Sequence, residues 1–146
     1  MVKNSNIHTS LLMLLFLGMI TLSCNSNKKA KDDGFVETES GLKYKILKEG
    51  SGKSVKAGQE VLVHETMSYT NDSILFDSRT LPNPVKILVG GGQAVAGVDE
   101  ALVGMKKGEI KKLIVPPKLS KRTGEHTFPN PDSTLLYKVE LIDIVE

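Results

Sequence analysis

Few side chains in this sequence are of the types that perform covalent or metal chemistry. The 146 residues include one cysteine, Cys24, and three histidines, at positions 8, 64 and 126. A single cysteine excludes an internal disulfide and a zinc site with several thiolates, and the histidines form no short-spaced ligand cluster. We therefore expect no structural metal and no bound cofactor.

Phosphate and nucleic acid chemistry also lack support. The glycine run at 90–92 lacks the Lys and the Ser or Thr of a phosphate-binding P-loop, so we interpret it as a flexible approach to the segment that follows. The formal net charge is +2, and basic residues are spread among acidic ones. Nucleic acid binding requires a concentrated basic surface, so we expect no nucleic acid partner.

Cys24 is informative because of its position. It follows an apolar run at 11–22 that has the shape of a secretory signal peptide and is too short to span a bilayer, which takes about 20 residues. Residues 21–24 resemble a bacterial lipobox, in which cleavage precedes a cysteine that carries diacylglycerol. Ser23 is the small residue before the cut, whereas Thr21 departs from the usual aliphatic residue. A plain signal peptide followed by an incidental free cysteine is the alternative.

The chain therefore divides into a lipoprotein signal peptide at 1–23, a flexible tether at 24–37 and one folded domain at 38–146. Residues 25–34 are polar and charged, without apolar periodicity. The length allows one compact domain and is too short for two. We expect a monomeric domain in a bacterial cell envelope, with membrane contact through lipidated Cys24.

Alternating apolar residues predict half-buried antiparallel strands around 42–46, 61–67 and 135–141. Glu65 occupies one inward position, and the neighbouring His64 should pack behind the sheet. Turns are expected at 48–52, 71–73 and 106–108, where Gly, Asn and Asp tolerate turn dihedrals, and prolines at 82, 84, 116 and 117 interrupt strands.

Only residues 98–103 have a helical pattern. Asp99 and Glu100 lie in the first turn, Val98 and Leu102 are four positions apart, and Gly104 follows the end. Since the other signals are strands, we predict an α+β fold in which a curved antiparallel sheet wraps over one short helix.

Six segments lie in the order and near the spacing of one known family, over about 105 residues. They are GLKYKILKEG at 41–50, VHET at 63–66, FDSR at 76–79, GVDEAL at 97–102, GMKKGE at 104–109 and TLLYKVELIDI at 134–144. Together they resemble the FKBP-type peptidyl-prolyl cis-trans isomerases, in the bacterial lipoprotein form to which some gliding-motility-associated proteins belong. The resemblance implies a five- to six-stranded half-barrel around one short helix, with an apolar pocket for a prolyl side chain.

The reaction implied by this resemblance is rotation about the X-Pro bond of proline-containing polypeptides. The uncatalysed barrier is about 18–20 kcal/mol because amide resonance must be broken. A water-poor pocket lowers it by holding the twisted amide, without a covalent step.

The resemblance also implies roles for four residues. Phe76 takes the place of a pocket-wall aromatic, and Asp77 that of a carboxylate beside the substrate carbonyl. Val95 matches the residue whose backbone N–H holds the substrate, and Tyr137 stands where the family usually has an inward Phe. Phe76 and Tyr137 could instead be ordinary core aromatics, and Asp77 could belong to a turn.

Further substrate-binding positions are Val85, Ala94, Val98, Glu65 and Lys121, and most depart from the family pattern. Val98 replaces a Trp at the pocket floor, and Val85 replaces an aromatic wall. Glu65 and Lys121 replace tyrosines, and they could form a hydrated ion pair across the cavity mouth. Large-to-small changes of this type cost about 3–5 kcal/mol, so we expect weakened prolyl affinity.

Two functions remain open at this point. The first is a modest prolyl isomerase that assists slow prolyl steps in the folding of envelope proteins. The second is a binding module or chaperone subunit that keeps the fold with little catalysis, since fold alone does not separate the two.

Overall fold

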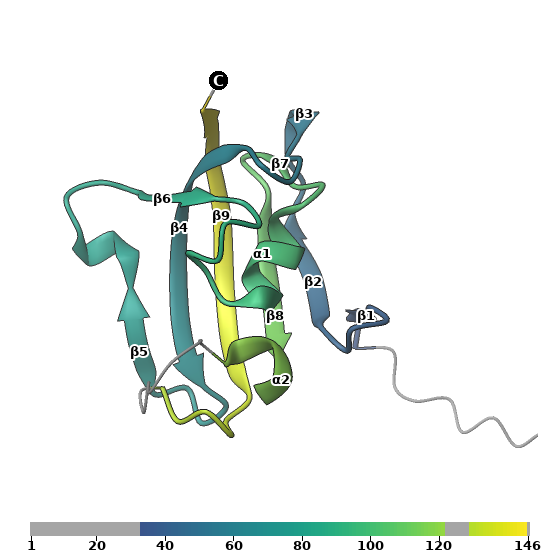
Figure 1. The fold of residues 1–146 in the computed structure, drawn as a ribbon, viewed down its shortest axis with the longest axis vertical. Helices are drawn as coiled ribbons and strands as arrows, with labels where there is room; N and C mark the ends of the chain where they lie inside the picture. The colour runs from purple at the N-terminus through teal and green to yellow at the C-terminus, as the bar shows by residue number, and fades with distance from the viewer. Residues whose placement is uncertain (1–32, 122–128, 146) are drawn as a thin grey trace, which may run out of the picture. The chain divides into compact units, whose positions relative to one another are not determined.

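The computed structural model describes residues 33–121 and 129–145, so the expected leader and Cys24 lie outside the described residues. The strands form an antiparallel seven-stranded sheet in the order β1-β2-β8-β9-β4-β5, with β6 also paired to β4 (Figure 1). Its members are β1 (Val36–Glu37), β2 (Lys43–Lys48), β4 (Glu60–Tyr69), β5 (Ile74–Asp77), β6 (Val85–Leu88), β8 (Ile110–Val115) and β9 (Leu135–Val145). Strand β1 pairs with β2 ahead of the expected domain start at residue 38.

The two longest strands, β4 and β9, form the centre of the sheet and pair along their whole lengths. Their inward residues are buried where the alternation predicts, at Val61, Val63 and Met67 of β4 and at Leu135, Tyr137, Val139 and Leu141 of β9. The core is aliphatic apart from Tyr137 and lies on the sheet face that carries the helix. The predicted half-barrel fold is confirmed.

Strand β2 departs from the predicted half-buried pattern. Leu42, just before it, is buried, but Ile46 is 39% exposed and Leu47 49% exposed. The register with β8 shifts between Ile46 and Lys48, so Leu47 is the extra residue of a bulge. Burial fades because only the two-residue β1 lies beyond β2 at this margin of the sheet.

The predicted helix forms as α1 (Ala96–Leu102), beginning two residues earlier than expected. A Cβ atom on Gly97 would lie 2.6 Å from Cγ1 of Val115, so this glycine permits the close approach of α1 to β8. A second short helix, α2 (Pro117–Ser120), was not predicted. Proline is compatible with the first turn of a helix, because an N–H at that position has no partner within the helix and its absence costs nothing. The prolines at 116 and 117 were interpreted only as residues that interrupt strands, so the helix that begins there was missed.

Two of the predicted turns contain short strands. Residues 51–54 and 106–107 pair as β3 (Ser51–Ser54) and β7 (Lys106–Lys107) in a separate two-stranded sheet. Gly52 and Gly108 have φ of 84° and 82°, as turn residues should. The turn chemistry was correctly identified, but it occupies fewer residues than expected.

Lys111 of β8 forms a hydrogen bond with the C-terminal end of α1. It is buried, and its Nζ donates to the Ala101 carbonyl oxygen at 2.9 Å, near the negative end of the helix. The same nitrogen lies 3.5 Å from a Glu109 carboxylate oxygen and 5.0 Å from the centre of the Tyr44 ring. Burial lowers the pKa of Lys111, while Glu109 opposes that shift.

Candidate functional site

A cavity of about 160 Å³ lies between the start of α1 and strands β4, β6 and β9. Most of the predicted site residues line it, namely Glu65, Val85, Ala94, Val95, Val98 and Tyr137, together with Lys86, Ile87 and Gln93. Aliphatic and aromatic side chains thus share the lining with three polar ones. A cavity of this composition can bind an apolar group whose polar neighbours remain at the rim.

The first turn of α1 forms one side of the cavity. Val95 is the N-terminal cap residue, and its carbonyl oxygen accepts the Val98 N–H at 2.9 Å and the Asp99 N–H at 3.1 Å. Val95 is buried, and its own N–H donates no hydrogen bond within the described residues. An N–H group at a helix start lacks a partner in the helix and can serve an external acceptor.

The approach to α1 is braced by Gln93. Its Oε1 accepts the Leu88 N–H at 2.8 Å, which ties the glycine-containing turn at 90–92 to the end of β6. On the other side of the cavity, the Nζ of Lys86 lies 2.6 Å from Oε2 of Glu60, so this cation is held by a carboxylate on β4. These two contacts hold the polar side chains of Gln93 and Lys86 in place at the edge of the cavity.

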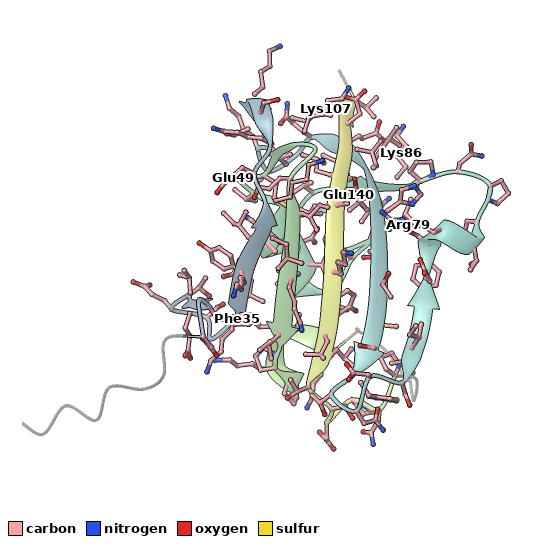
Figure 2. All side chains as sticks on the ribbon, turned by 180° about the vertical axis from the view of Figure 1, so that it is seen from behind. Phe35, Glu49, Arg79, Lys86, Lys107 and Glu140 are labelled. Carbon is pink, nitrogen blue, oxygen red and sulfur yellow. The ribbon has the colours of Figure 1, made fainter. Side chains whose placement is uncertain are left out.

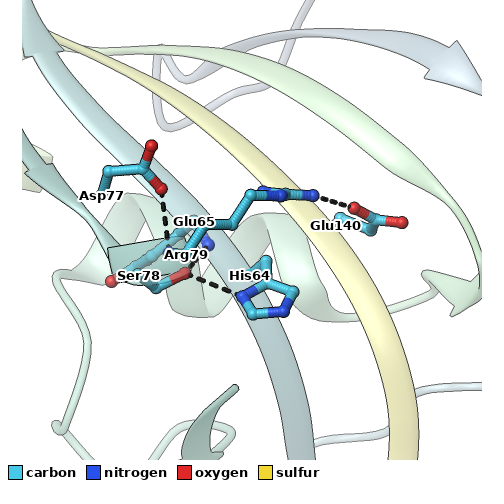
Figure 3. A network of polar contacts seen from close by, with 6 residues as sticks. All are labelled: His64, Glu65, Asp77, Ser78, Arg79 and Glu140. Carbon is cyan, nitrogen blue, oxygen red and sulfur yellow. Dashed lines mark hydrogen bonds and ion pairs between the residues drawn. The ribbon is translucent and has the colours of Figure 1, made fainter. Parts of the chain in front are cut away.

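Glu65 lies where β4 changes partners. Strand β4 pairs with β6 as far as Val63 and with β5 from Thr66 onward. Between these ladders, the buried Ser78 hydroxyl accepts the Glu65 N–H at 2.8 Å and lies 3.1 Å from His64 Nδ1 (Figure 3). Ser78 therefore closes the break in the sheet beside the cavity.

Ser78 was missed as a site-forming residue. The FDSR motif pointed to its position, but strand periodicity does not reveal that a hydroxyl substitutes for a missing backbone partner. Ser78 begins the 3-10 helix η1 (Ser78–Thr80), which follows β5 directly. Arg79 in this turn forms an ion pair with Glu140 of β9, so the turn is fastened to the far side of β4 (Figure 3).

Phe76 and Asp77 do not line this cavity. Phe76 is half-buried against the core, opposite Met67 in the register. The Asp77 carboxylate accepts the Arg79 N–H at 2.9 Å and caps η1, which is the turn chemistry that the sequence left open.

Tyr137 is 4% exposed, and its hydroxyl donates to Met67 Sδ at 2.9 Å. Met67 is directly opposite Phe76 on one side and Tyr137 on the other. Residues that are opposite in a ladder share a face, so Met67 separates the two aromatic residues by one strand. Phe76 and Tyr137 therefore lie on strands that are not adjacent to each other.

Lys121 does not pair with Glu65. Its Nζ lies 3.8 Å from Asp132 Oδ1, and both side chains are exposed. The hypothesis of a Glu65–Lys121 ion pair is therefore wrong for this structure, because Lys121 faces a carboxylate on the returning segment. The Ser120 hydroxyl holds that segment by donating to the Ser133 carbonyl oxygen at 3.3 Å.

No three His, Cys, Asp or Glu side chains gather as a possible metal site in residues 33–121 and 129–145. Across the same ranges, the structure contains no helix with the length and apolar character needed to cross a membrane.

An antiparallel half-barrel around a short helix, with a small partly apolar cavity between them, defines the class of fold to which FKBP domains belong. The family model for FKBP-type peptidyl-prolyl cis-trans isomerase matches residues 51–142. The chain belongs to this family. The predictions of family, fold and enzyme class are confirmed.

Individual relatives agree with this assignment. FK506-binding protein 1 of Dictyostelium discoideum is 36% identical over 104 residues, which are 70% of this chain and 96% of that protein. Peptidyl-prolyl cis-trans isomerase Mip of Chlamydia pneumoniae is 34% identical over 116 residues, 79% of this chain and 43% of Mip. The crystal structure of FkpA from Escherichia coli matches with a TM-score of 0.68 and 31% identity, covering 79% of this chain and 53% of FkpA. The chain thus spans about half the length of the last two proteins.

Proposed function

We propose that this chain isomerises X-Pro bonds of cell-envelope polypeptides and binds the prolyl side chain in the cavity beside α1. The observation that carries the proposal is the Val95 N–H, which donates to no group of the described residues, in a cavity lined by Val85, Val98 and Tyr137. One donor and an apolar wall are what an imino acid with an adjacent carbonyl requires.

In the proposed mechanism, no proton or electron pair is transferred. The valine side chains and Tyr137 displace water from the X-Pro amide, which removes solvent that stabilises its planar, polar form. The Val95 N–H donates to a substrate carbonyl oxygen and fixes the chain while the bond rotates. Interactions of this kind accelerate rotation only if they are stronger for the twisted amide than for the planar one.

The proposed activity is modest because valines occupy two cavity positions at which the family usually has aromatic residues. Val98 and Val85 offer less contact surface to a prolyl ring than the aromatic residues usual at these positions in the family. Phe76 and Asp77 remain proposed contributors from the neighbouring strand. Asp77 would have to exchange its bond to the Arg79 N–H for a substrate contact.

The second candidate is a binding module with little catalysis. It is favoured by the engagement of Asp77 in capping η1 and by the aliphatic cavity floor. Both candidates bind proline-containing segments, and only the rate of isomerisation separates them.

A proline-limited refolding assay with the full chain in mild detergent tests the proposal. We expect acceleration over the uncatalysed rate at micromolar protein, and a further increase in Val98→Trp, alone or with Glu65→Tyr. Val103→Trp is the matched control, because Val103 is 47% exposed and lies just beyond the same helix. A wild-type rate equal to background would reject catalysis and leave the binding module.

We also propose that residues 1–23 are a lipoprotein signal peptide, that Cys24 carries the lipid, and that a tether starting at 24 links it to the domain, whose sheet includes β1 (Val36–Glu37) just ahead of the expected start at 38. The sequence pattern around Cys24 supports this arrangement. Mass spectrometry of membrane-extracted protein should find an N-terminal peptide that begins with diacylglyceryl-modified Cys24, and Cys24→Ser should abolish it. A mature N-terminus elsewhere, with Cys24 as a free thiol, would refute the anchor.

A further inference from the structure

Three lysines form a row across the sheet face that is turned away from α1. Lys45 of β2 is opposite Lys112 of β8, and Lys112 is opposite Lys138 of β9. Residues that are opposite in a ladder share a face, and the adjacent Tyr137 and Leu113 point into the core. Figure 2 shows this outer face.

The row is unfavourable for the isolated domain. Like charges directly opposite each other destabilise a sheet, and lysine is disfavoured in strands. Lys112 and Lys138 form no ion pair within the described part of the chain, and Lys45 bonds to a backbone oxygen, that of Asp33, at 3.1 Å. The row therefore presents positive charge that the described domain does not neutralise.

Two carboxylates of the same face are already engaged with other cations. Glu140 pairs with Arg79, and both are labelled on the outer face in Figure 2. Glu37 lies 3.4 Å from Lys43. If one of these carboxylates moved to the lysine row, it would leave Arg79 or Lys43 without its partner. An external anion is therefore the simpler partner for the lysine row.

An apolar groove of about 310 Å³ lies beside this row. Lys112 and Lys138 line it together with Leu47, Leu136, Thr66, Ser68, Asp72 and Tyr137. Leu47 is the bulged residue of β2, and bulges commonly redirect a side chain next to a site. The groove thus combines exposed leucine surface, two hydroxyl groups, two cations and one carboxylate, that of Asp72, so its lining carries a net positive charge.

We propose that this groove binds an extended acidic polypeptide segment that alternates carboxylate and apolar side chains. The carboxylates would pair with Lys112 and Lys138, and an apolar side chain would contact Leu47. Every second residue of an extended chain is about 6.4–6.8 Å away, and adjacent strands lie about 4.7–4.9 Å apart, distances that flexible lysine side chains can bridge. A concave, partly apolar groove fits a polypeptide better than a planar lipid surface.

The groove lies on the face opposite the cavity beside α1, so this inference does not depend on the proposed prolyl function. A segment bound there would raise the local concentration of the rest of its chain near the cavity. The surface would thus select clients by charge.

The test is fluorescence anisotropy with the full chain and a labelled, proline-free peptide that alternates glutamate with leucine. We expect saturable binding that weakens with salt and falls about tenfold or more in Lys112→Glu with Lys138→Glu. A peptide with glutamine in place of glutamate should bind far more weakly. The milder pair Lys112→Gln with Lys138→Gln provides the same test if the charge reversal impairs folding.

The matched control is Lys56→Glu with Lys106→Glu, which changes the net charge equally at exposed positions outside the groove lining. We expect its affinity to stay within about twofold of wild type, because only screened long-range charge changes. Equal weakening by both pairs of substitutions would overturn the proposal. It would also be overturned if the peptide fails to bind while a preference for anionic over zwitterionic vesicles is lost in Lys112→Glu with Lys138→Glu, since that result indicates a membrane surface.

Discussion

The two faces of strands β4, β8 and β9 carry opposite chemistry on one backbone. On the inner face, Tyr137 and Val98 border a cavity that aliphatic, aromatic and polar side chains line together. On the outer face, Lys138, the residue next to Tyr137, joins Lys112 in a charged row. The inner face should depend on packing and be insensitive to salt, whereas the outer face should depend on charge and be screened by salt.

The comparison shows how one ladder can present two different surfaces, each with its own proposed kind of recognition. Because successive residues of a strand point to opposite faces, the inner face can be held rigid by helix packing while the outer face keeps long, mobile side chains. Gly97 and Lys111 act on the inner side, where they set the position of α1. Substitutions on each face should therefore separate into large packing effects and small charge effects.

The largest effect is expected on the inner face. Tyr137→Ala should lower the free energy of unfolding by about 3–5 kcal/mol, because a buried ring is lost and a void remains. Tyr137→Phe, which keeps the ring and removes the hydroxyl that donates to Met67, should cost about 1 kcal/mol. Urea unfolding measures both values. Equal losses in the two variants would mean that the hydroxyl, and not the ring, supports the cavity.

Lys111→Met should cost about 1.5–3 kcal/mol at neutral pH, since the charged donor to the Ala101 carbonyl is lost. Adding Glu109→Gln should recover part of the loss. Lys111→Met leaves the buried Glu109 carboxylate without its cation, and Glu109→Gln removes that charge. Thermal or urea unfolding of the single and double variants decides. A double variant that is less stable than the single one would contradict this account of the pair.

The same lysine predicts a pH dependence. Burial lowers the folded-state pKa of Lys111 below its usual 10.5, so between these two values the unfolded chain binds more protons. Stability from this group should therefore rise with pH in that window and be lowest below the folded pKa. The difference in unfolding free energy between wild type and Lys111→Met, followed into alkaline pH, should grow. A constant difference would show that the pKa of Lys111 does not change on folding.

Ser78→Ala should cost about 1–2 kcal/mol, because the Glu65 N–H loses its acceptor at a buried position between β5 and β6. Ser73→Ala is the control, since Ser73 is exposed in the turn between β4 and β5. Hydrogen exchange at the Glu65 amide should be faster in Ser78→Ala. Unchanged exchange there would indicate that another group, such as water, closes the break.

The smallest effect is expected on the outer face and has the opposite sign. Lys138→Thr should raise the unfolding free energy by about 0.2–1 kcal/mol, because it removes a repulsive cross-strand pair with Lys112 and adds a good strand former. Added salt should reduce the gain. A loss of stability, measured in the same urea titration, would mean that the lysine row does not strain the domain.

The sequence was sufficient for elements whose local pattern and tertiary environment agree. Strands β4 and β9 are central and show the expected burial, and α1 begins within two residues of its predicted start. Strand β2 has the same alternation, but Ile46 is exposed because burial depends on neighbours that periodicity does not contain. The partner of Lys121 was mispredicted for the same reason, since the proximity of Asp132 exists only in the folded chain.

The cavity itself was predictable only through family resemblance. Val85, Val95 and Val98 have no local feature that distinguishes them from core valines, yet they line the cavity with Tyr137. The role of Ser78 was not predictable in either way, because it follows from a change of strand partners that exists only in the folded sheet. Residues that interact through the backbone are the hardest to identify from sequence.

The most direct test is a titration of the isotope-labelled chain with a short proline-containing peptide, followed by NMR chemical shifts. We predict that the amides of Val95, Val98 and Tyr137 shift together with one dissociation constant, while those of Lys112 and Ile114 on the outer face stay unchanged. Exchange between the cis and trans peptide signals should accelerate at the same time. Shifts confined to the outer face, or binding that leaves the Val95 amide unchanged, would contradict the assignment of the prolyl site to the cavity beside α1.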